Sequence, residues 1–285
     1  MPFAPEAYIV GAAKSGTTTL ADLLDSHPDI SVSDPKEPDF FTLVDHRARG
    51  ESWYRRCFAG RPARVRIDAS TSYGMAPLDG PTEGVPAAIH RRKPDARIIF
   101  VLRDPIARAW SSYWHAVRAG WEDRPFDEAV RDPAGFHQRG SLYHARINEY
   151  LAVFPRQQLL LLEFEQLKHD PLAIARQAAA FLGCEPDALP EPERQQSNSG
   201  FVYSPAGQLL HSVIGTDGMR RLNSLAKRTA PGLANAAKSF VASPVPAISE
   251  AEATLCRALF AEDAGALQAD LGVETRRSRW WADAL

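Results

Sequence analysis

Residues 8–24 read YIVGAAKSGTTTLADLL, and this stretch decides the fold. The apolar residues 8–10 predict a short strand, and the small residues 11–13 predict a tight turn. From Thr17 onward the leucines recur at helical spacing, so a helix follows the turn. Such a junction points several backbone N–H groups at one spot, and the positive end of the helix dipole adds to them. The stretch therefore predicts a site for a phosphate or a sulfate group.

The side chains of this loop also suit an anion. Lys14 brings a full positive charge. Hydroxyl and backbone donors follow it at Ser15, Gly16, Thr17, Thr18 and Thr19. The loop of the nucleoside-triphosphatases places its lysine after the second glycine, whereas Lys14 stands ahead of Gly16, so that motif does not match. For the loop alone, an ordinary strand-to-helix turn with a solvated lysine stays open as the alternative.

Strands and helices alternate as far as residue 183, which predicts an α/β fold with a P-loop-like, doubly wound parallel sheet flanked by helices. We expect strands at 8–10, 30–33, 65–68, 97–102 and 159–164. We expect helices from Thr17 and at 51–58, 86–92, 105–120, 126–130, 143–154 and 171–182. The run 97–102 is almost continuously apolar, as is typical of a parallel strand covered on both faces.

The last hundred residues differ in character. We expect a loop at 185–204, helices at 206–214 and 218–228, and a proline-containing linker at 230–248. A last helix opens with a capping box formed by Ser249 and Glu252. Glu262 and Asp263 interrupt its apolar face. We expect this helical extension to pack on the sheet.

Length and composition bound the function. At 285 residues the chain is long enough for one large core, and we expect a single domain over 1–285. Its α/β nucleotide-binding core is expected at 1–183, and the loop and helical part at 184–285 is expected to complete the site. The net charge of −2 predicts no general affinity for nucleic acid or for a membrane surface, so an anion site must be local.

The cysteines and the amino terminus point to a reducing compartment. Cys57, Cys184 and Cys256 are odd in number and far apart, which predicts neither a disulfide framework nor a metal site. The opening residues lack the basic and apolar segments of a signal peptide, and no apolar run approaches the roughly 20 residues that span a bilayer. We therefore expect a cytoplasmic protein without a metal.

A second anion-binding feature follows the strand at 97–102. Arg103 comes directly after that strand, at the edge where open α/β sheets bind ligands. Ser111 follows eight residues later in the next helix. A guanidinium and a hydroxyl together can hold a phosphate. On spacing alone, Arg103 could equally cap the strand or pair with Asp104.

A carboxylate lies on a loop after the strand at 30–33. Glu37 stands between two prolines, where it could face the anion loop and take a proton from an attacking group. A solvated loop carboxylate is the alternative interpretation. His27 is the nearest competing base, but its helix-ending turn favours a structural role.

Taken together, these segments resemble the sulfotransferases that use 3′-phosphoadenosine 5′-phosphosulfate (PAPS), in particular the heparan sulfate type and bacterial members. The resemblance rests on Lys-Ser-Gly-Thr-Thr at 14–18, on Arg-Asp-Pro at 103–105 with Ser111, and on Lys-Glu-Pro-Asp-Phe-Phe at 36–41. It implies that residues 14–19 hold the 5′-phosphosulfate and that Arg103 and Ser111 hold the 3′-phosphate. It further implies that Lys14 steadies the transferring group and that Glu37 is the base.

The chain departs from this family in two places. A late basic loop that often clamps the 3′-phosphate is replaced by a stretch without lysine or arginine, where Ser199 and Gly200, or else Arg194, would have to supply donors. Asp39 stands where some relatives have histidine, so the contacts of that histidine cannot be transferred.

The sequence thus favours sulfuryl transfer to a hydroxyl or amine of a carbohydrate or small-molecule acceptor. One rival is a nucleotide kinase, which needs a lysine where Thr17 stands. The other is a non-catalytic nucleotide- or glycan-binding module. The acceptor and the oligomeric state stay open, since the aromatic residues that could line a pocket are more often core. They are Phe40, Phe41, Trp53, Tyr73 and Trp114.

Overall fold

The computed structural model describes residues 2–75, 84–191, 201–203 and 242–281. A five-stranded sheet, in the order β2-β3-β1-β4-β5, forms its centre, and all neighbouring strands in it are parallel. A separate pair, β6 and β7, is antiparallel. The fold is therefore the α/β architecture with a parallel sheet that the alternating pattern predicts.

The strands and helices have the following bounds. The strands are β1 (Ala7–Gly11), β2 (Ile30–Val32), β3 (Val65–Asp68), β4 (Arg97–Leu102), β5 (Leu159–Glu163), β6 (Phe201–Tyr203) and β7 (Ala242–Pro244). The α-helices are α1 (Thr17–Asp25), α2 (Val44–Ala48), α3 (Gly50–Arg56), α4 (Val85–Arg92), α5 (Pro105–Ala119), α6 (Phe126–Arg131), α7 (Phe136–Arg139), α8 (Tyr143–Leu151), α9 (Phe164–His169), α10 (Pro171–Phe181) and α13 (Glu250–Leu271). Short 3₁₀ turns are η1 (Thr71–Met75), η2 (Arg156–Gln158), η3 (Pro186–Ala188) and η4 (Arg279–Trp281).

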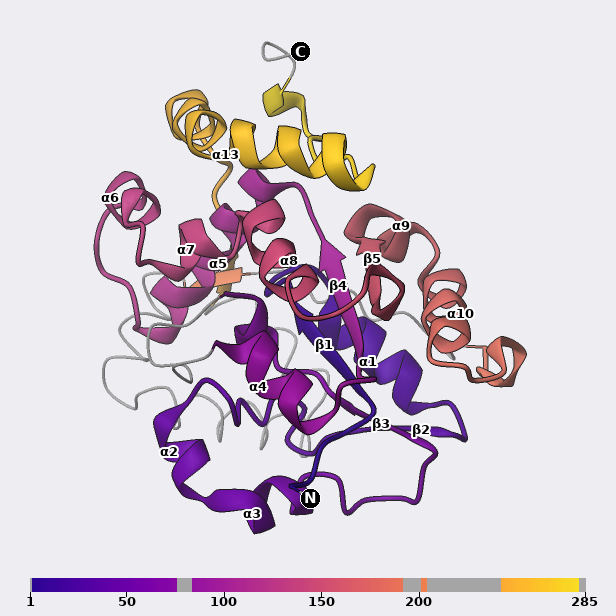
Figure 1. Ribbon diagram of the computed structural model, residues 1–285. Helices are drawn as coiled ribbons and strands as arrows, with labels where there is room; N and C mark the ends of the chain where they lie inside the picture. Colours follow the sequence, from indigo (N-terminus) through magenta and orange to yellow (C-terminus); the bar gives the residue numbers. More distant parts are fainter. Residues whose placement is uncertain (1, 76–83, 192–200, 204–241, 282–285) are drawn as a thin grey trace, which may run out of the picture.

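Helices cover both faces of the sheet, as Figure 1 shows with α4 and α8 on one side of the strands and α1 and α10 on the other. Successive side chains of a strand point to opposite faces, so β1 contributes to two cores. Tyr8 and Val10 pack in the core beneath α4 and α8, whereas Ala7 and Ile9 pack in the core beneath α1 and α10. This two-sided burial explains why β1 and β4 are apolar along nearly their whole length.

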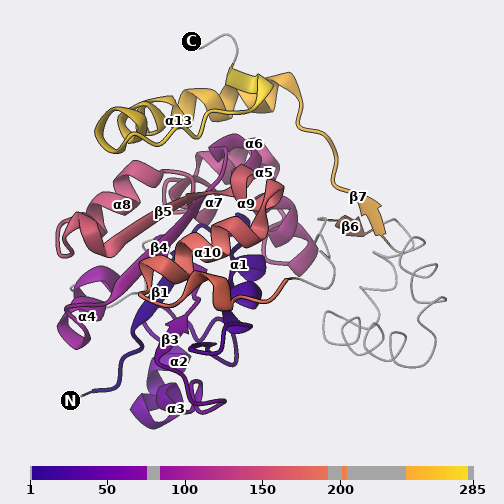
Figure 2. The ribbon, with the colours of Figure 1, turned by 90° about the vertical axis from the view of Figure 1, so that its right-hand side faces the viewer.

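The carboxy-terminal helix α13 lies across the end of the sheet, over α5 and α8 (Figures 1 and 2). Its capping box of Ser249 and Glu252 is present as predicted. The interruption expected at Asp263 has a structural reason, because its carboxylate accepts the backbone N–H groups of His144 and Ala145 at 2.9 and 3.0 Å. Asp263 thus caps the first turn of α8, and α13 runs on without a break.

The tail after α13 returns to the sheet. The Asp104 carboxylate caps α5 by accepting the N–H of Ala107 at 2.9 Å. Its other oxygen accepts the indole N–H of Trp281 at 2.7 Å and the backbone N–H of Ser278 at 3.1 Å. Trp281 is buried in a third core with α5, α6 and α13. This contact joins the end of the described chain to the residue next to Arg103.

Three sequence predictions are corrected. The strand expected at 159–164 ends at Glu163, and Phe164 begins α9, which the sequence analysis did not predict. The helix expected at 143–154 ends at Leu151. The segments expected as loop and linker contain β6 and β7, which pair with each other. The helices expected at 206–214 and 218–228 lie outside the described residues.

None of the described helices combines the length and the apolar character that crossing a bilayer requires.

Candidate active site

The loop between β1 and α1 has the geometry of an anion cradle. Lys14 and Gly16 both take a positive φ, at 70° and 80°, which turns the chain sharply into the helix. A side chain at position 16 would meet the Leu167 and Phe164 side chains at 3.0 and 3.1 Å, so only glycine fits. No side chain caps the first turn of α1, whose N–H groups are thus left for a ligand.

The side chains of the predicted loop residues differ in exposure. Ser15 and Thr17 are buried, Thr19 is half-buried, and Thr18 is exposed. The buried Ser15 hydroxyl has no hydrogen-bond partner among the described residues, although the phenol of Tyr143 lies beside it. A buried hydroxyl without a partner is costly, which is the state expected of a donor awaiting an anion.

Arg103 and Lys14 lie together, although they are 89 positions apart in the chain. The Arg103 guanidinium donates from Nη1 to the Lys14 carbonyl oxygen at 2.9 Å. It also stacks over the Phe164 ring, with 4.7 Å from Cζ to the centroid. Arg103 Nε is buried and has no partner within the described part of the chain. The pairing with Asp104 that the sequence left open does not form in this arrangement, because that carboxylate binds α5 and the tail instead.

Burial lowers the pKa of Lys14 below its ordinary value, and the neighbouring charges of Arg118 and Arg103 lower it further. The charge of Glu37 acts in the opposite direction. Burial likewise lowers the pKa of Arg103. These cations therefore share one partly desolvated region, where an anion would relieve their mutual repulsion.

One face of α5 turns toward this region. His115 and Arg118 lie there, as their interaction with Lys14 shows, and the half-buried Ser111 precedes them by four and seven residues on the same face of the helix. Sequence reasoning missed His115 and Arg118, although their spacing from Ser111 was visible. Arg118 Nη2 lies 2.8 Å from His115 Nδ1. Because a guanidinium can only donate, Nδ1 must accept, and the hydrogen of the imidazole sits on Nε2.

His115 is therefore a neutral donor in this site. Burial lowers its pKa to about 4, and the charges of Lys14 and Arg118 act in the same direction. Its accepting nitrogen is already occupied by Arg118. The arrangement makes His115 unsuited to take a proton from an acceptor.

Glu37 lies close enough to Lys14 for its charge to act on that residue. Its side chain is 39% exposed and pairs with Lys36 at 2.7 Å from Nζ to Oε1. Thr71 donates to the same oxygen at 3.4 Å. These contacts orient the carboxylate, while its exposure leaves room for an approaching substrate.

Asp39 lies two residues later on the same loop. Burial raises its pKa to about 6, and Glu37 raises it further by repulsion, whereas a hydrogen bond from the Ser72 hydroxyl opposes the shift. Beneath it, burial also raises the pKa of the fully buried Asp68 to about 6. Asp68 accepts from the hydroxyls of Tyr54 at 2.7 Å and Tyr73 at 2.9 Å. These hydrogen bonds hold Asp68, Tyr54 and Tyr73 together in the core near the loop that carries Asp39.

Most aromatic residues considered for a pocket belong to the core. Phe40, Phe41 and Tyr73 are 5%, 3% and 1% exposed. Trp53 and Trp114 are partly buried against the cores. The buried His27 accepts the N–H of Asp29 at 3.0 Å and faces the Glu185 carbonyl at 2.8 Å, which gives it a structural role.

Two further predictions concern the late donor residues Ser199 and Gly200 and the metal. Ser199 and Gly200 lie outside the described residues. Within the described ranges, no three His, Cys, Asp or Glu side chains gather as a metal site would require.

Comparison with known proteins gives a consistent result. The family model described as "Sulfotransferase domain" matches residues 4–199. A solved structure of a sulfotransferase from Alicyclobacillus acidocaldarius is 30% identical, with a TM-score of 0.59, and the match covers 78% of this chain and 96% of that one.

Curated relatives include two mouse enzymes. Heparan sulfate glucosamine 3-O-sulfotransferase 6 is 31% identical over 186 residues, which are 63% of this chain and 52% of the relative. Heparan sulfate glucosamine 3-O-sulfotransferase 5 is 27% identical over 195 residues, which are 64% of this chain and 54% of the relative. The chain thus spans about half the length of the curated relatives it matches.

Proposed function

The chain belongs to the sulfotransferase family, and on that premise we propose that it moves a sulfuryl group from PAPS to a hydroxyl or amine of a carbohydrate or small-molecule acceptor. The observation that carries the proposal is the meeting of Lys14, Arg103 and Glu37. Arg103 Nη1 donates a hydrogen bond of 2.9 Å to the backbone carbonyl oxygen of Lys14, and the charge of Glu37 acts on the Lys14 side chain.

The residues present fit such a donor. The Ser15 hydroxyl and Arg103 Nε are both buried without partners in the described chain, and both are hydrogen-bond donors. At Gly16 an added carbon would meet the Leu167 and Phe164 side chains at 3.0 and 3.1 Å, so the loop packs closely against α9. Donors without partners on a tightly packed loop suit the phosphate groups of a nucleotide.

We assign the donor contacts as follows. The backbone and hydroxyl donors of residues 15–19 would hold the 5′-phosphosulfate, and Arg103 with Ser111 would hold the 3′-phosphate. Ser199 and Gly200 would add donors to the same phosphate. The donor, when bound, supplies a sulfuryl group on a phosphate leaving group.

The chain's own residues then supply the charge and the proton acceptor. Lys14 places positive charge where the leaving phosphate gathers negative charge. Glu37 accepts the proton of the attacking hydroxyl or amine, because it is the oriented carboxylate beside Lys14 with an exposed edge. His115 cannot replace it, because Arg118 occupies its accepting nitrogen.

A carbohydrate is the acceptor class we favour. The curated relatives are named for heparan sulfate glucosamine, and the Glu37 segment resembles the corresponding segment of heparan-type enzymes. We further propose that residues 1–285 act as one domain, with the core at 1–183 carrying the donor site and the part at 184–285 completing it.

A transfer assay with ³⁵S-labelled PAPS tests the function. We expect the protein to label glucosamine-containing oligosaccharides, and Glu37→Gln to lower turnover about a hundredfold or more while binding of 3′,5′-adenosine bisphosphate stays unchanged. Glu149→Gln is the matched control, since Glu149 is 42% exposed and pairs with Arg146 at the same 2.7 Å.

Two results would contradict the proposal. Normal turnover in Glu37→Gln would remove Glu37 as the base. Tight binding of ATP–Mg²⁺ with no affinity for 3′,5′-adenosine bisphosphate would favour the kinase alternative.

A further inference from the structure

Trp121 is an unusual surface residue. Its side chain is 68% exposed, the largest exposure among the bulky apolar residues of the described chain. It follows α5, the helix that carries Ser111, His115 and Arg118. An exposed indole offers a large apolar face with a polar N–H at its edge, which a ligand can contact.

The backbone holds Trp121 in one place. Gly120 ends α5 with a φ of 74°, and the N–H of Trp121 donates to the Ala116 carbonyl at 2.9 Å. This is the usual way in which a glycine closes a helix, and it fixes the direction in which the next residue leaves. The indole is therefore presented by a defined turn.

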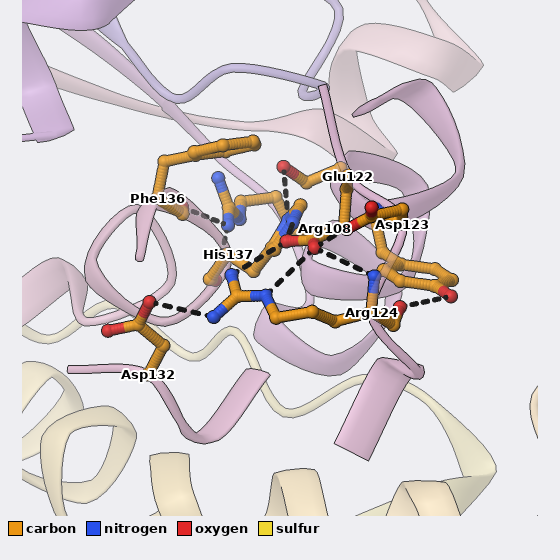
Figure 3. Close-up of polar contacts among 9 residues, drawn as sticks. Arg108, Glu122, Asp123, Arg124, Asp132, Phe136 and His137 are labelled. Atoms are coloured by element: carbon orange, nitrogen blue, oxygen red, sulfur yellow. Dashed lines mark hydrogen bonds and ion pairs between the residues drawn. The ribbon is translucent and has the colours of Figure 1, made fainter. Parts of the chain in front are cut away.

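The next residue anchors that turn in the protein, as Figure 3 shows. Glu122 is 5% exposed and accepts two hydrogen bonds from the Arg124 guanidinium, at 2.9 Å from Nε and 2.8 Å from Nη2. It also accepts the backbone N–H groups of Asp123 and Arg124. These donors lower the pKa of Glu122 to about 2, so the anchor stays charged at neutral pH.

The anchor extends to α5 itself. His137 is buried, with Nε2 3.5 Å from Glu122 and Nδ1 3.2 Å from the Ser112 hydroxyl. Ser112 is the neighbour of Ser111 on α5. Glu122 and His137, both drawn in Figure 3, therefore link the residue after Trp121 to α5 through Ser112.

Trp121 adjoins the candidate active site through His115. The two rings meet edge to face, with centroids 5.7 Å apart and planes at 86°. His115 is bound to Arg118, whose charge acts on Lys14, and the charge of Lys14 in turn helps to lower the pKa of His115. The exposed indole thus lies against a residue on which the Lys14 charge acts.

We propose that Trp121 is an acceptor-binding residue, on which a sugar ring of the acceptor stacks beside His115 and Arg118. This inference rests on the proposed function. A sugar has an apolar C–H face for the indole and hydroxyl groups for the donors at its edge. A rigid indole loses little entropy on binding, which is why tryptophan serves as an anchor.

The test uses Trp121→Ala, Trp121→Phe and, as a control, Phe136→Ala, which removes another exposed aromatic that borders the same cluster. The probes are a glucosamine–glucuronic acid hexasaccharide and 4-nitrophenol. We expect Trp121→Ala to raise KM for the hexasaccharide about tenfold, with KM for PAPS and kcat within about twofold of the native values. Trp121→Phe should restore most of the affinity, and Phe136→Ala should leave it unchanged.

Calorimetry of the protein loaded with 3′,5′-adenosine bisphosphate separates this inference from the function itself. Hexasaccharide binding that Trp121→Ala abolishes supports the inference even if no sulfate is transferred. Unchanged KM and unchanged binding in Trp121→Ala overturn it, as does a wild-type protein that binds no hexasaccharide. An equal loss for 4-nitrophenol also overturns it, because the surface would then serve aryl groups.

Discussion

The donor side and the acceptor side of the candidate site are built in different ways. The proposed donor side uses the backbone of β1 and α1. It also uses two cations that follow the carboxyl ends of the central strands β1 and β4, Lys14 and Arg103. The proposed acceptor side uses side chains on loops, above all Glu37, which pairs with Lys36, and Trp121, which directly precedes the Glu122–Arg124 ion pair. A backbone cradle tolerates few changes, whereas a loop can exchange its side chains. We therefore expect substitutions on the donor side to have the larger effects.

The largest effect is expected at Lys14. Lys14→Ala removes the charge nearest the leaving phosphate and should lower kcat about a thousandfold. Lys93→Ala is the control, since Lys93 pairs with Asp95 after α4. Single-turnover transfer of ³⁵S measures the change, and a loss of less than about tenfold would place Lys14 outside the chemistry.

A substitution of Arg103 tests whether Arg103 and Lys14 bind different phosphate groups of the nucleotide. Arg103→Gln should weaken binding of 3′,5′-adenosine bisphosphate about thirtyfold, because a charge-assisted contact is lost, and should change binding of adenosine 5′-phosphate little. Calorimetric titration with both nucleotides decides. Equal weakening of the two would mean that Arg103 only supports the Lys14 carbonyl.

Gly16 tests the cradle itself. Gly16→Ala places a carbon against Leu167 and Phe164 at a positive φ and should lower the free energy of unfolding by about 2–3 kcal/mol. Gly265→Ala is the opposite control, since Gly265 lies within α13 with open space around it and alanine favours helices. Urea unfolding measures both, and equal stability of Gly16→Ala and the native protein would argue against a constrained loop.

The smallest effect is expected at Asp39, on the acceptor side. Its pKa is raised from 3.8 to about 6 in the folded protein, so the folded state holds the proton more tightly than the unfolded chain. The resulting stability is present below pH 4 and is lost as the pH rises through about 6. Asp39→Asn lacks this dependence.

The native protein should therefore gain about 2 kcal/mol relative to Asp39→Asn between pH 7 and pH 4. Asp68 titrates in the same range, and because the Asp39 charge helps to raise its pKa, part of this difference passes through Asp68 with the same sign. Urea unfolding at several pH values measures it. A difference that does not change with pH would mean that Asp39 is not desolvated.

The contrast between the two sides also explains what the sequence could predict. The donor loop is contiguous, and its strand, turn and helix follow from residues 8–24 alone. Arg103 could be placed at the carboxyl end of a central strand because the strand before it is almost continuously apolar. Local patterns were sufficient wherever the site is made by neighbouring residues.

The remaining features depend on contacts between distant segments. Asp263 reads as an interruption of the apolar face of the last helix until its partner at the start of α8, 119 positions away, is known. The spacing of His115 and Arg118 was visible, but the face of α5 that meets Lys14 is set by packing. The apolar run 159–164 gives no sign that Phe164 leaves the strand, because its ring is suited to either state.

The contact between Asp104 and Trp281 has a consequence for biosynthesis. The two residues are 177 positions apart, so a ribosome has made the whole donor loop long before the indole emerges. Until then one oxygen of the Asp104 carboxylate, beside Arg103, lacks the two donors that the tail provides. The strands of the sheet are thus made early, whereas the contact that settles Asp104 beside Arg103 can form only after the chain has been made as far as Trp281.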